Sequence, residues 1–402
     1  MRILKYTMSK IYISLFISLF TIQLVVGQSN FTLSNLSQIS IITSGPGDQL
    51  YEKFGHTAIR VKDPILSLDL IYNYGMFDFN DANFYVNFTK GYMKYKLARY
   101  PFYIALKDNQ KHQRWVKEQI LNLNTEERNA LFSFLENNAL PENAGYFYDP
   151  FFDNCATKPR DILKEILGKK FLFSESFVES PNSLRQLMNI EIHPNTWASL
   201  GINIALGSKL DKTATPSEYL YLPDYVYTSI AQSAIKTSEG EKPLVLKENI
   251  LLDFDEITPQ SDSISPLLIL SLLFIITVLI TRKDLQNNKR TTWFDATLFF
   301  LTGLTGCLIV FLWFFTNHST APNNFNFLWA FAPNLFLFFI IKKGTPPKWT
   351  QKYMVVLLCL LAIIPVVWIL GVQLFTYPMI PLFLLLGIRY WFLYKKLSIA
   401  NS

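Results

Sequence analysis

Five apolar segments fill the last third of this chain, and they constrain its fold more than any other feature. An apolar stretch of about 17 to 25 residues is long enough to cross a lipid bilayer as a helix. The sequence therefore predicts an all-α bundle of about five transmembrane helices within residues 264–396. The segments lie at about residues 265–281, 296–315, 325–341, 353–374 and 375–393.

The charges between these segments predict how the bundle crosses the membrane. Lys and Arg are concentrated in residues 282–294, in residues 342–352 and directly after the fifth segment, whereas residues 316–324 contain neither. Cytoplasmic loops of membrane proteins carry the excess of basic residues. We therefore expect the basic loops and a short tail, residues 397–402, to be cytoplasmic, and everything before residue 264 to lie outside.

The N-terminus independently predicts export. A basic start precedes a short apolar run, and Val25 and Gly27 stand at the two positions that a signal peptidase reads. We expect a signal peptide, residues 1–27; an uncleaved anchor is the alternative. The mature chain then begins with a periplasmic domain, residues 28–250. A polar linker, residues 251–263, connects this domain to the bundle in a bacterial inner (cytoplasmic) membrane.

The composition narrows the possible partners. The chain of 402 residues is 17% charged, against about 25% in a soluble protein, and the deficit lies almost entirely in the bundle. The net charge of +6 reflects the basic cytoplasmic loops, and no Lys/Arg run is long enough to predict a nucleic-acid partner. The exported domain contains one cysteine and three scattered histidines, so we expect no metal site and no other cofactor.

The exported domain alternates between strand and helix patterns, which predicts an α+β fold. Three β-prone runs end at turn residues and predict a small antiparallel sheet: residues 38–43, 56–62 and 69–74. Amphipathic patterns predict four helices, over residues 107–121, from 124 or 125 to 137, from near 155 to 167, and over 183–188.

The lone exported cysteine, Cys155, stands where a turn meets a predicted helix. Exposed backbone N–H groups and the helix dipole at such a position stabilise a thiolate and can bind an oxyanion. Pro159 would remove a hydrogen bond from a regular helix starting at Cys155. The first turn therefore begins nearer Thr157, or the helix is kinked.

A nucleophilic cysteine needs a base, and the exported domain offers His56, His112 and His193. His56 opens a predicted strand, which could hold its ring rigidly, and a cysteine at a helix start packed against such a histidine is the arrangement of several hydrolases and acyltransferases. A third residue should orient His56. The options on the adjacent strand are Asp69, Asn73 and Tyr74.

Three stretches together resemble a known family: GPGDQLYEKFGHTAIRVKDP, NYGMFDFNDANFYVNFTKGYMKYKLARYPF and YFYDPFFDNCATKPRDIL. They are similar to the Lnb-type periplasmic domain of Bacteroidetes membrane proteins, and LGSKLDKTATPSEYLYLPDYV and NHSTAPNNFNFLWAFAPN extend the resemblance into the bundle. The family is similar to permuted NlpC/P60 and LRAT-like domains, so the resemblance implies a papain-like fold. It also implies that Cys155 is the nucleophile and His56 the general base and acid. Pro159 departs from the family pattern, in which an aliphatic residue is commoner.

The resemblance further implies a lipoprotein N-acyltransferase. A phospholipid would donate an acyl chain to Cys155, and the N-terminal α-amine of a diacylated lipoprotein would accept it, with no cofactor. Asn154 and Tyr148, which flank Cys155, and His318, in the outer loop, are candidate substrate-binding residues. Two simpler structural interpretations stay open. The outer loop could be an ordinary interfacial loop, and KGYMKYKLARY an ordinary solvated face instead of a headgroup contact.

Two alternatives compete with the acyltransferase. A membrane-anchored NlpC/P60-type cell-wall peptidase or amidase would use the same Cys–His chemistry with water as the acceptor, but it has no need of five spanning helices. A non-enzymatic sensor or assembly partner would keep Cys155 for structural reasons only, and would tolerate its loss.

Overall fold

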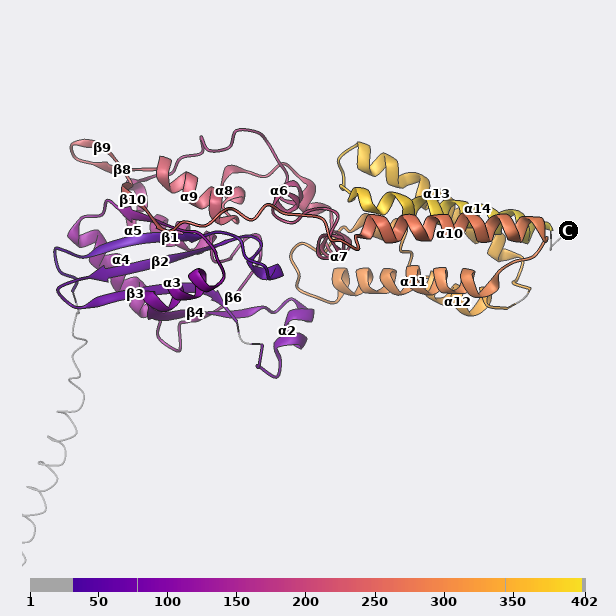
Figure 1. Cartoon of the computed structure of the whole chain (residues 1–402), viewed down its shortest axis with the longest axis horizontal. Coiled ribbons are helices and arrows are strands. Elements are labelled where there is room, and N and C mark those ends of the chain that lie inside the picture. The colour runs from indigo at the N-terminus through magenta and orange to yellow at the C-terminus, as the bar shows by residue number, and fades with distance from the viewer. Residues whose placement is uncertain (1–31, 78, 344, 400–402) are drawn as a thin grey trace, which may run out of the picture.

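A computed structural model describes residues 32–77, 79–343 and 345–399, and shows an α/β domain joined end to end with a helical bundle (Figure 1). The predicted signal peptide lies outside the described residues, as do residues 400–402 of the predicted tail. The predicted combination of an α+β domain with a C-terminal helical bundle is confirmed.

The N-terminal domain is built on a seven-stranded sheet in which every neighbouring pair is antiparallel. The three predicted strands are confirmed and lie at its centre. Ile41 faces Ile59, and Ile59 faces Tyr72, so buried side chains are aligned across these strands. The spatial order is β10 (Val245–Leu252), β5 (Val116–Leu121), β1 (Gln38–Ser44), β2 (His56–Asp63), β3 (Leu68–Met76), β4 (Lys94–Pro101) and β6 (Gly145–Phe147).

Helices cover both faces of the sheet. On one face α4 (Thr125–Asn138) and α5 (Thr157–Leu167) pack on the main core, and on the other α3 (Phe102–Lys111) packs through Phe102. Asn124 caps α4 and Ser183 caps the predicted helix near 183–188, each in a capping box, because their side chains accept free backbone N–H groups. The remaining elements are α2 (Phe84–Lys90), α6 (Leu184–Glu191), α7 (Trp197–Ala205), α8 (Pro216–Tyr219), α9 (Pro223–Gln232) and a small sheet of β7 (Phe171–Leu172), β8 (Ala234–Thr237) and β9 (Gly240–Pro243).

One predicted helix, over residues 107–121, is wrong. The helix α3 ends at Lys111, Gln113 adopts a φ of 52°, and the chain continues as β5. Strand β5 is hydrogen-bonded on both sides, to β1 and to β10. Its buried polar side chains also find partners there, since Ser40 donates to Glu118 over 2.8 Å. Pairing with distant strands therefore overrides a locally helical pattern.

The bundle contains four described helices that are long and apolar enough to span a membrane. They are α10 (Pro266–Gln286), α11 (Thr292–Phe314), α13 (Trp349–Ile369) and α14 (Ile380–Ile399). The third predicted segment is divided: a 3-10 turn, η4 (Phe325–Leu328), precedes a short helix, α12 (Asn334–Ile341). Pro333 lies at the division, where it lacks the N–H that a continuous helix would use. Gly306 of α11 lets this break pack closely, because a Cβ there would lie 2.1 Å from the carbonyl oxygen of Ala330.

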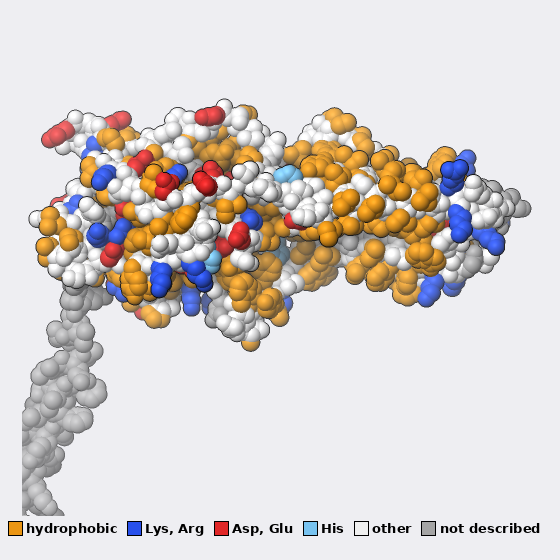
Figure 2. Space-filling model, in the orientation of Figure 1, with side chains coloured by type: hydrophobic (Ala, Val, Ile, Leu, Met, Phe, Trp, Pro, Cys, Tyr) orange, Lys and Arg blue, Asp and Glu red, His pale blue; other side chains and the backbone are white. Residues whose placement is uncertain are grey.

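Lys and Arg side chains gather at the end of the bundle farthest from the N-terminal domain (Figure 2). Loops 282–294 and 342–352 lie at this end, whereas loop 316–324 contacts the N-terminal domain. The positive-inside rule predicts that the basic end is cytoplasmic.

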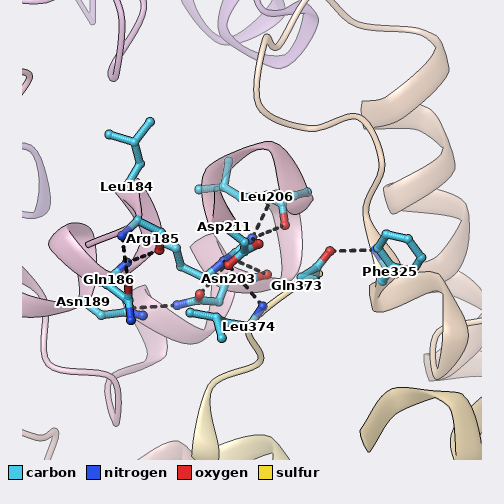
Figure 3. Close-up of polar contacts among 12 residues, drawn as sticks. Leu184, Arg185, Gln186, Asn189, Asn203, Leu206, Asp211, Phe325, Gln373 and Leu374 are labelled. Carbon is cyan, nitrogen blue, oxygen red and sulfur yellow. Dashed lines mark hydrogen bonds and ion pairs between the residues drawn. The ribbon is translucent and has the colours of Figure 1, made fainter. Parts of the chain in front are cut away.

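The two parts of the molecule are joined by a polar junction around α7. Arg185 of α6 donates from Nε to Asp211 over 2.8 Å, and the same carboxylate accepts the backbone N–H of Leu374 from the bundle over 3.1 Å (Figure 3). Asn326 of the bundle donates to the carbonyl oxygen of Asn203 over 3.0 Å. Because these groups are buried and paired, the junction fixes the domain on the bundle.

Replacing Arg185 with methionine should destabilise this junction strongly. The side chains of Arg185 and Asp211 are each only 1% exposed, so the variant leaves a buried carboxylate without its cation, which costs about 3–5 kcal/mol. We expect a large fall in the thermal unfolding temperature. Arg99→Ala is the matched control, because the Arg99–Glu136 pair is 40% and 37% exposed and contributes about 1 kcal/mol or less. Equal unfolding temperatures for the two variants would contradict the prediction.

Candidate active site

His56 is held at the first position of β2 by the backbone before it. Gly55 adopts a φ of 73°, a left-handed conformation that other residues rarely take. A Cβ on Gly55 would also lie 2.9 Å from the carbonyl oxygen of Ser44 on β1. The tight turn therefore delivers the imidazole to the end of the sheet, where it is half-buried.

Cys155 lies two residues before the first residue of α5, at the positive end of that helix. The helix begins at Thr157, as one of the two sequence alternatives predicts. Pro159 is then its third residue, where no helical N–H bond is formed, so the proline carries no penalty. Cys155 is half-buried, so part of the residue is accessible.

The amide of Asn154 is bonded to the backbone around it, and its predicted role in substrate binding stays a prediction. Its Oδ1 accepts the backbone N–H groups of Ala156 and Thr157, and its Nδ2 donates to the carbonyl oxygens of Pro150 and Tyr221. Both donors and both acceptor sites of the amide are thus used. Asn154 shapes the loop that presents Cys155.

The structure brings His56 and Cys155 together, and each shifts the pKa of the other. Burial alone would raise the pKa of Cys155, but the imidazolium charge and a hydrogen bond from His56 lower it below its ordinary value, helped by the backbone N–H groups of Thr57 and Cys155. Burial alone would lower the pKa of His56, yet the thiolate charge, its hydrogen bond and Asn73 raise it. The pair therefore favours a thiolate beside an imidazolium.

Asn73, and not Asp69, contacts the histidine. The Oδ1 atom of Asn73 lies 2.6 Å from Nε2 of His56, while its Nδ2 donates to the hydroxyl of Tyr100 over 2.8 Å. The amide is thereby oriented so that Oδ1 accepts a hydrogen bond from the Nε2–H group, which leaves Nδ1 for the sulfur. Asp69 instead forms a salt bridge of 2.7 Å with Arg60.

Asn73→Ala should reduce the reactivity of Cys155 by weakening the orientation of His56. Without the amide acceptor the ring is free to rotate and to protonate Nδ1, so the active tautomer is less populated. We expect this reactivity to fall by about 10- to 100-fold, the effect typical of removing a residue that orients a functional histidine. The pH profile of Cys155 alkylation should also shift upward, because the amide helps to raise the pKa of His56. Asp69→Ala is the control, and should leave the profile in place.

Arg114 is a charged residue near the pair that the sequence did not indicate. It is 7% exposed, donates from Nε to the carbonyl oxygen of Gly45 over 2.8 Å and lies 3.5 Å from Glu52. Burial lowers the pKa of Arg114, while the charges of Glu52, Asp108 and the nearby thiolate, in that order, oppose this shift. Its Nη2 has no partner among the described residues. A fixed positive charge beside the site favours negative charge on sulfur or substrate.

The two remaining predicted residues, Tyr148 and His318, each contact an aromatic ring of the N-terminal domain. Tyr148 stacks on Tyr95 with ring centroids 4.5 Å apart, and burial followed by the nearby thiolate charge raises its pKa well above the usual range. His318 lies in the outer loop against Phe88, 6.3 Å between centroids, and bonds to the backbone of Phe88 and Thr89. Burial is the main cause that lowers the pKa of His318.

The described residues contain no group of three or more His, Cys, Asp or Glu side chains that could hold a metal ion. The side chains at this site supply a thiolate, an imidazole, an orienting amide and a buried cation.

This fold and this site define a class of protein: a membrane protein whose α/β domain presents a Cys–His pair beside a helical bundle. A family model described as the Lnb N-terminal periplasmic domain matches residues 28–189, and one described as the Lnb transmembrane domain matches residues 258–398. The chain belongs to the Lnb family, and its N-terminal domain is periplasmic. It matches no curated protein and no solved structure. The similarity to NlpC/P60 domains stays a prediction.

Proposed function

We propose that this protein is a cysteine-dependent acyltransferase that moves an acyl chain from a membrane phospholipid to the N-terminal α-amine of a diacylated lipoprotein. Family membership suggests an enzyme of lipoprotein biogenesis. The observation that carries the proposal is the half-buried Cys155 just before α5. Contact with His56 lowers the pKa of its thiol.

In the first step, the Cys155 thiolate attacks the ester carbonyl carbon of the phospholipid. A carbon–sulfur bond forms, and the tetrahedral intermediate collapses by breaking the ester carbon–oxygen bond. The leaving lysophospholipid alkoxide takes the proton from the His56 imidazolium. The products are an acyl thioester on Cys155, a neutral histidine and a lysophospholipid.

In the second step, the lipoprotein amine attacks the thioester carbonyl. His56 removes the proton from the attacking nitrogen, the carbon–sulfur bond breaks, and an amide is released. The thiolate and imidazolium are then restored, so the cycle needs no oxidant, metal or nucleotide.

Two backbone donors are placed to stabilise the oxyanions of both steps. The N–H groups of Thr57 and Cys155 hydrogen-bond the resting thiolate. Once the sulfur is acylated it loses its negative charge, and these donors become free to stabilise a developing oxyanion. The buried charge of Arg114 adds a favourable potential at the same place.

The proposed reaction gives a physical reason for attaching the catalytic domain to a membrane bundle. Both proposed substrates are anchored in the membrane by lipid chains, and the enzyme is anchored there by its spanning helices. Confinement to one leaflet raises the effective concentration of each partner near Cys155.

The direct test uses the full-length protein reconstituted in phospholipid vesicles. We expect it to convert a synthetic diacylated lipopeptide with a free α-amine into a product heavier by one acyl group, with release of lysophospholipid, both detected by mass spectrometry. An acetylated lipopeptide, which has no free amine, is the matched control. Cleavage of added peptidoglycan fragments without lipopeptide acylation would favour the peptidase and overturn the proposal.

A further inference from the structure

The short helix α2 exposes apolar side chains on the periplasmic domain. Tyr85, Val86 and Phe88 are 67%, 52% and 48% exposed, and none of the residues of α2 is buried. Exposure of such side chains to water is unfavourable, and they are enriched where a protein meets a lipid interface. This helix is drawn beside the bundle in Figure 1, where Figure 2 shows a hydrophobic surface.

The contacts of α2 place it against the loop at the end of α11 that faces the N-terminal domain. The backbone N–H of Asn317, in the bundle's outer loop, donates to the carbonyl oxygen of Lys90 over 2.8 Å. His318 in the same loop packs on Phe88. Gly91 permits this approach, because a Cβ there would lie 2.6 Å from the backbone nitrogen of His318. The loop follows α11, so α2 lies where that spanning helix ends.

A continuous row of aromatic rings leads from α2 to the sulfur. Centroid distances are 6.2 Å from Phe88 to Phe84, 5.7 Å from Phe84 to Phe77, 5.0 Å from Phe77 to Tyr95 and 4.5 Å from Tyr95 to Tyr148. At its end, Tyr148 and Cys155 both flank Gly75: a Cβ on Gly75 would lie 3.3 Å from the Tyr148 ring and 3.5 Å from the Cβ of Cys155.

Basic residues and a small hollow accompany the row. Lys90, Lys94 and Lys96 are exposed beside the aromatic residues, and lysine ammonium groups near a membrane surface attract lipid phosphates. A hollow of about 40 Å³ lies between α2 and β4, with Phe84, Phe88, Met93 and Tyr95 in its lining. Basic and aromatic residues that alternate in the sequence therefore lie together on one surface of the domain.

We propose that α2 inserts its exposed side chains into the outer leaflet and that the aromatic row guides one acyl chain of a phospholipid from there to Cys155. This inference rests on the proposed function for the identity of the reaction, but the lipid contact itself is independent of turnover. Lys90, Lys94 and Lys96 contact the phosphate region of the same leaflet.

The lipid contact is tested by photo-crosslinking of the full chain. Benzoylphenylalanine is placed at position 85 or 88, and at position 65 as the control, since Ile65 is also exposed, at 65%, but lies in the β2–β3 turn. The proteins are reconstituted in vesicles of phosphatidylethanolamine and phosphatidylglycerol. We expect phospholipid adducts at positions 85 and 88 and few at 65. A lack of this difference, or crosslinking to a second protein chain instead, overturns the proposal.

The acyl path is tested by the triple variant Tyr85→Ser, Val86→Ser, Phe88→Ser. Burying one such aromatic side chain in an apolar medium is worth more than a tenfold change in an equilibrium, so we expect acyl transfer from bilayer phospholipid to fall by about tenfold or more. Alkylation of Cys155 by iodoacetamide should stay unchanged. The control triple variant, Leu36→Ser, Ile65→Ser, Leu246→Ser, alters equally exposed residues away from α2.

The outcomes separate the two proposals. Full transfer by the α2 variant would overturn the acyl path while leaving the acyltransferase intact. A wild-type protein that transfers no acyl chain would overturn the proposed function, and the crosslinking pattern would still decide whether α2 contacts lipid.

Discussion

Cys155→Ala should abolish acyl transfer while leaving the fold intact. The proposed reaction passes through a thioester on this sulfur, and loss of a covalent nucleophile typically lowers the rate on the order of 10⁴-fold or more. The residue is only half-buried, so alanine at this position should leave the thermal unfolding temperature nearly unchanged.

The measurement is the mass of lipoprotein N-terminal peptides from cells in which this chain is the sole source of the activity. We expect peptides with two acyl chains from the variant and three from the wild type. Cys359→Ala is the matched control, because that thiol is exposed on α13 within the bundle. Fully acylated peptides from the Cys155→Ala strain would show that the cysteine is structural.

His56→Ala should lower the rate of acyl transfer by about 10²- to 10⁴-fold, the usual contribution of a general base and acid. It should also change the titration of the thiol. In the wild type His56 lowers the pKa of Cys155, against burial, which raises it. Without the imidazolium the thiol loses its largest stabilising influence while burial still raises its pKa, so the thiol pKa must increase.

Alkylation by iodoacetamide reports this change, since only the thiolate reacts. In the wild type, the midpoint of the rate against pH should lie below the ordinary thiol value, and in the variant it should move upward. At neutral pH the variant should therefore react more slowly. His112→Ala is the control, because that ring is exposed and pairs with Asp108 at 3.6 Å. An unshifted midpoint in His56→Ala would refute the ion pair.

Local sequence patterns were sufficient for the central strands and for the two partners of this pair. β-prone runs that end at turn residues predict β1, β2 and β3, and the turn before His56 predicts a histidine at a strand end. The capping residue Asn124 predicts the start of α4. These signals are short-range, so they survive without knowledge of the tertiary structure.

The residue that orients His56 could be identified only from the strand register. Asp69 and Asn73 are four positions apart on β3 and point to the same face, so alternation alone cannot distinguish them. The observed register pairs Asp69 with Lys62, far along β2 from His56, while Asn73 follows Tyr72, which pairs with Ile59. Only Asn73 is then near the histidine.

The residues missed by sequence reasoning depend on long-range packing. Arg114 follows the end of α3, and nothing in its local sequence indicates that it is buried near Cys155. In the bundle, Asn334 stands in an apolar segment, yet it accepts from the Tyr353 hydroxyl over 2.7 Å and donates to Thr302 over 3.0 Å. Polar contacts between helices, together with Pro333, therefore divide a segment that reads as one continuous span.

The buried contacts between Arg185, Asp211 and Leu374 have a consequence for the proposed lipoprotein acceptor. Since they prevent the periplasmic domain from swinging away, the distance between the thiol and the bilayer is constant. A lipid-tethered protein reaches the thiol only if a flexible stretch separates its first residue from its globular body. Lipoproteins with short tethers should collide with the domain and be modified slowly, so tether length should rank substrates.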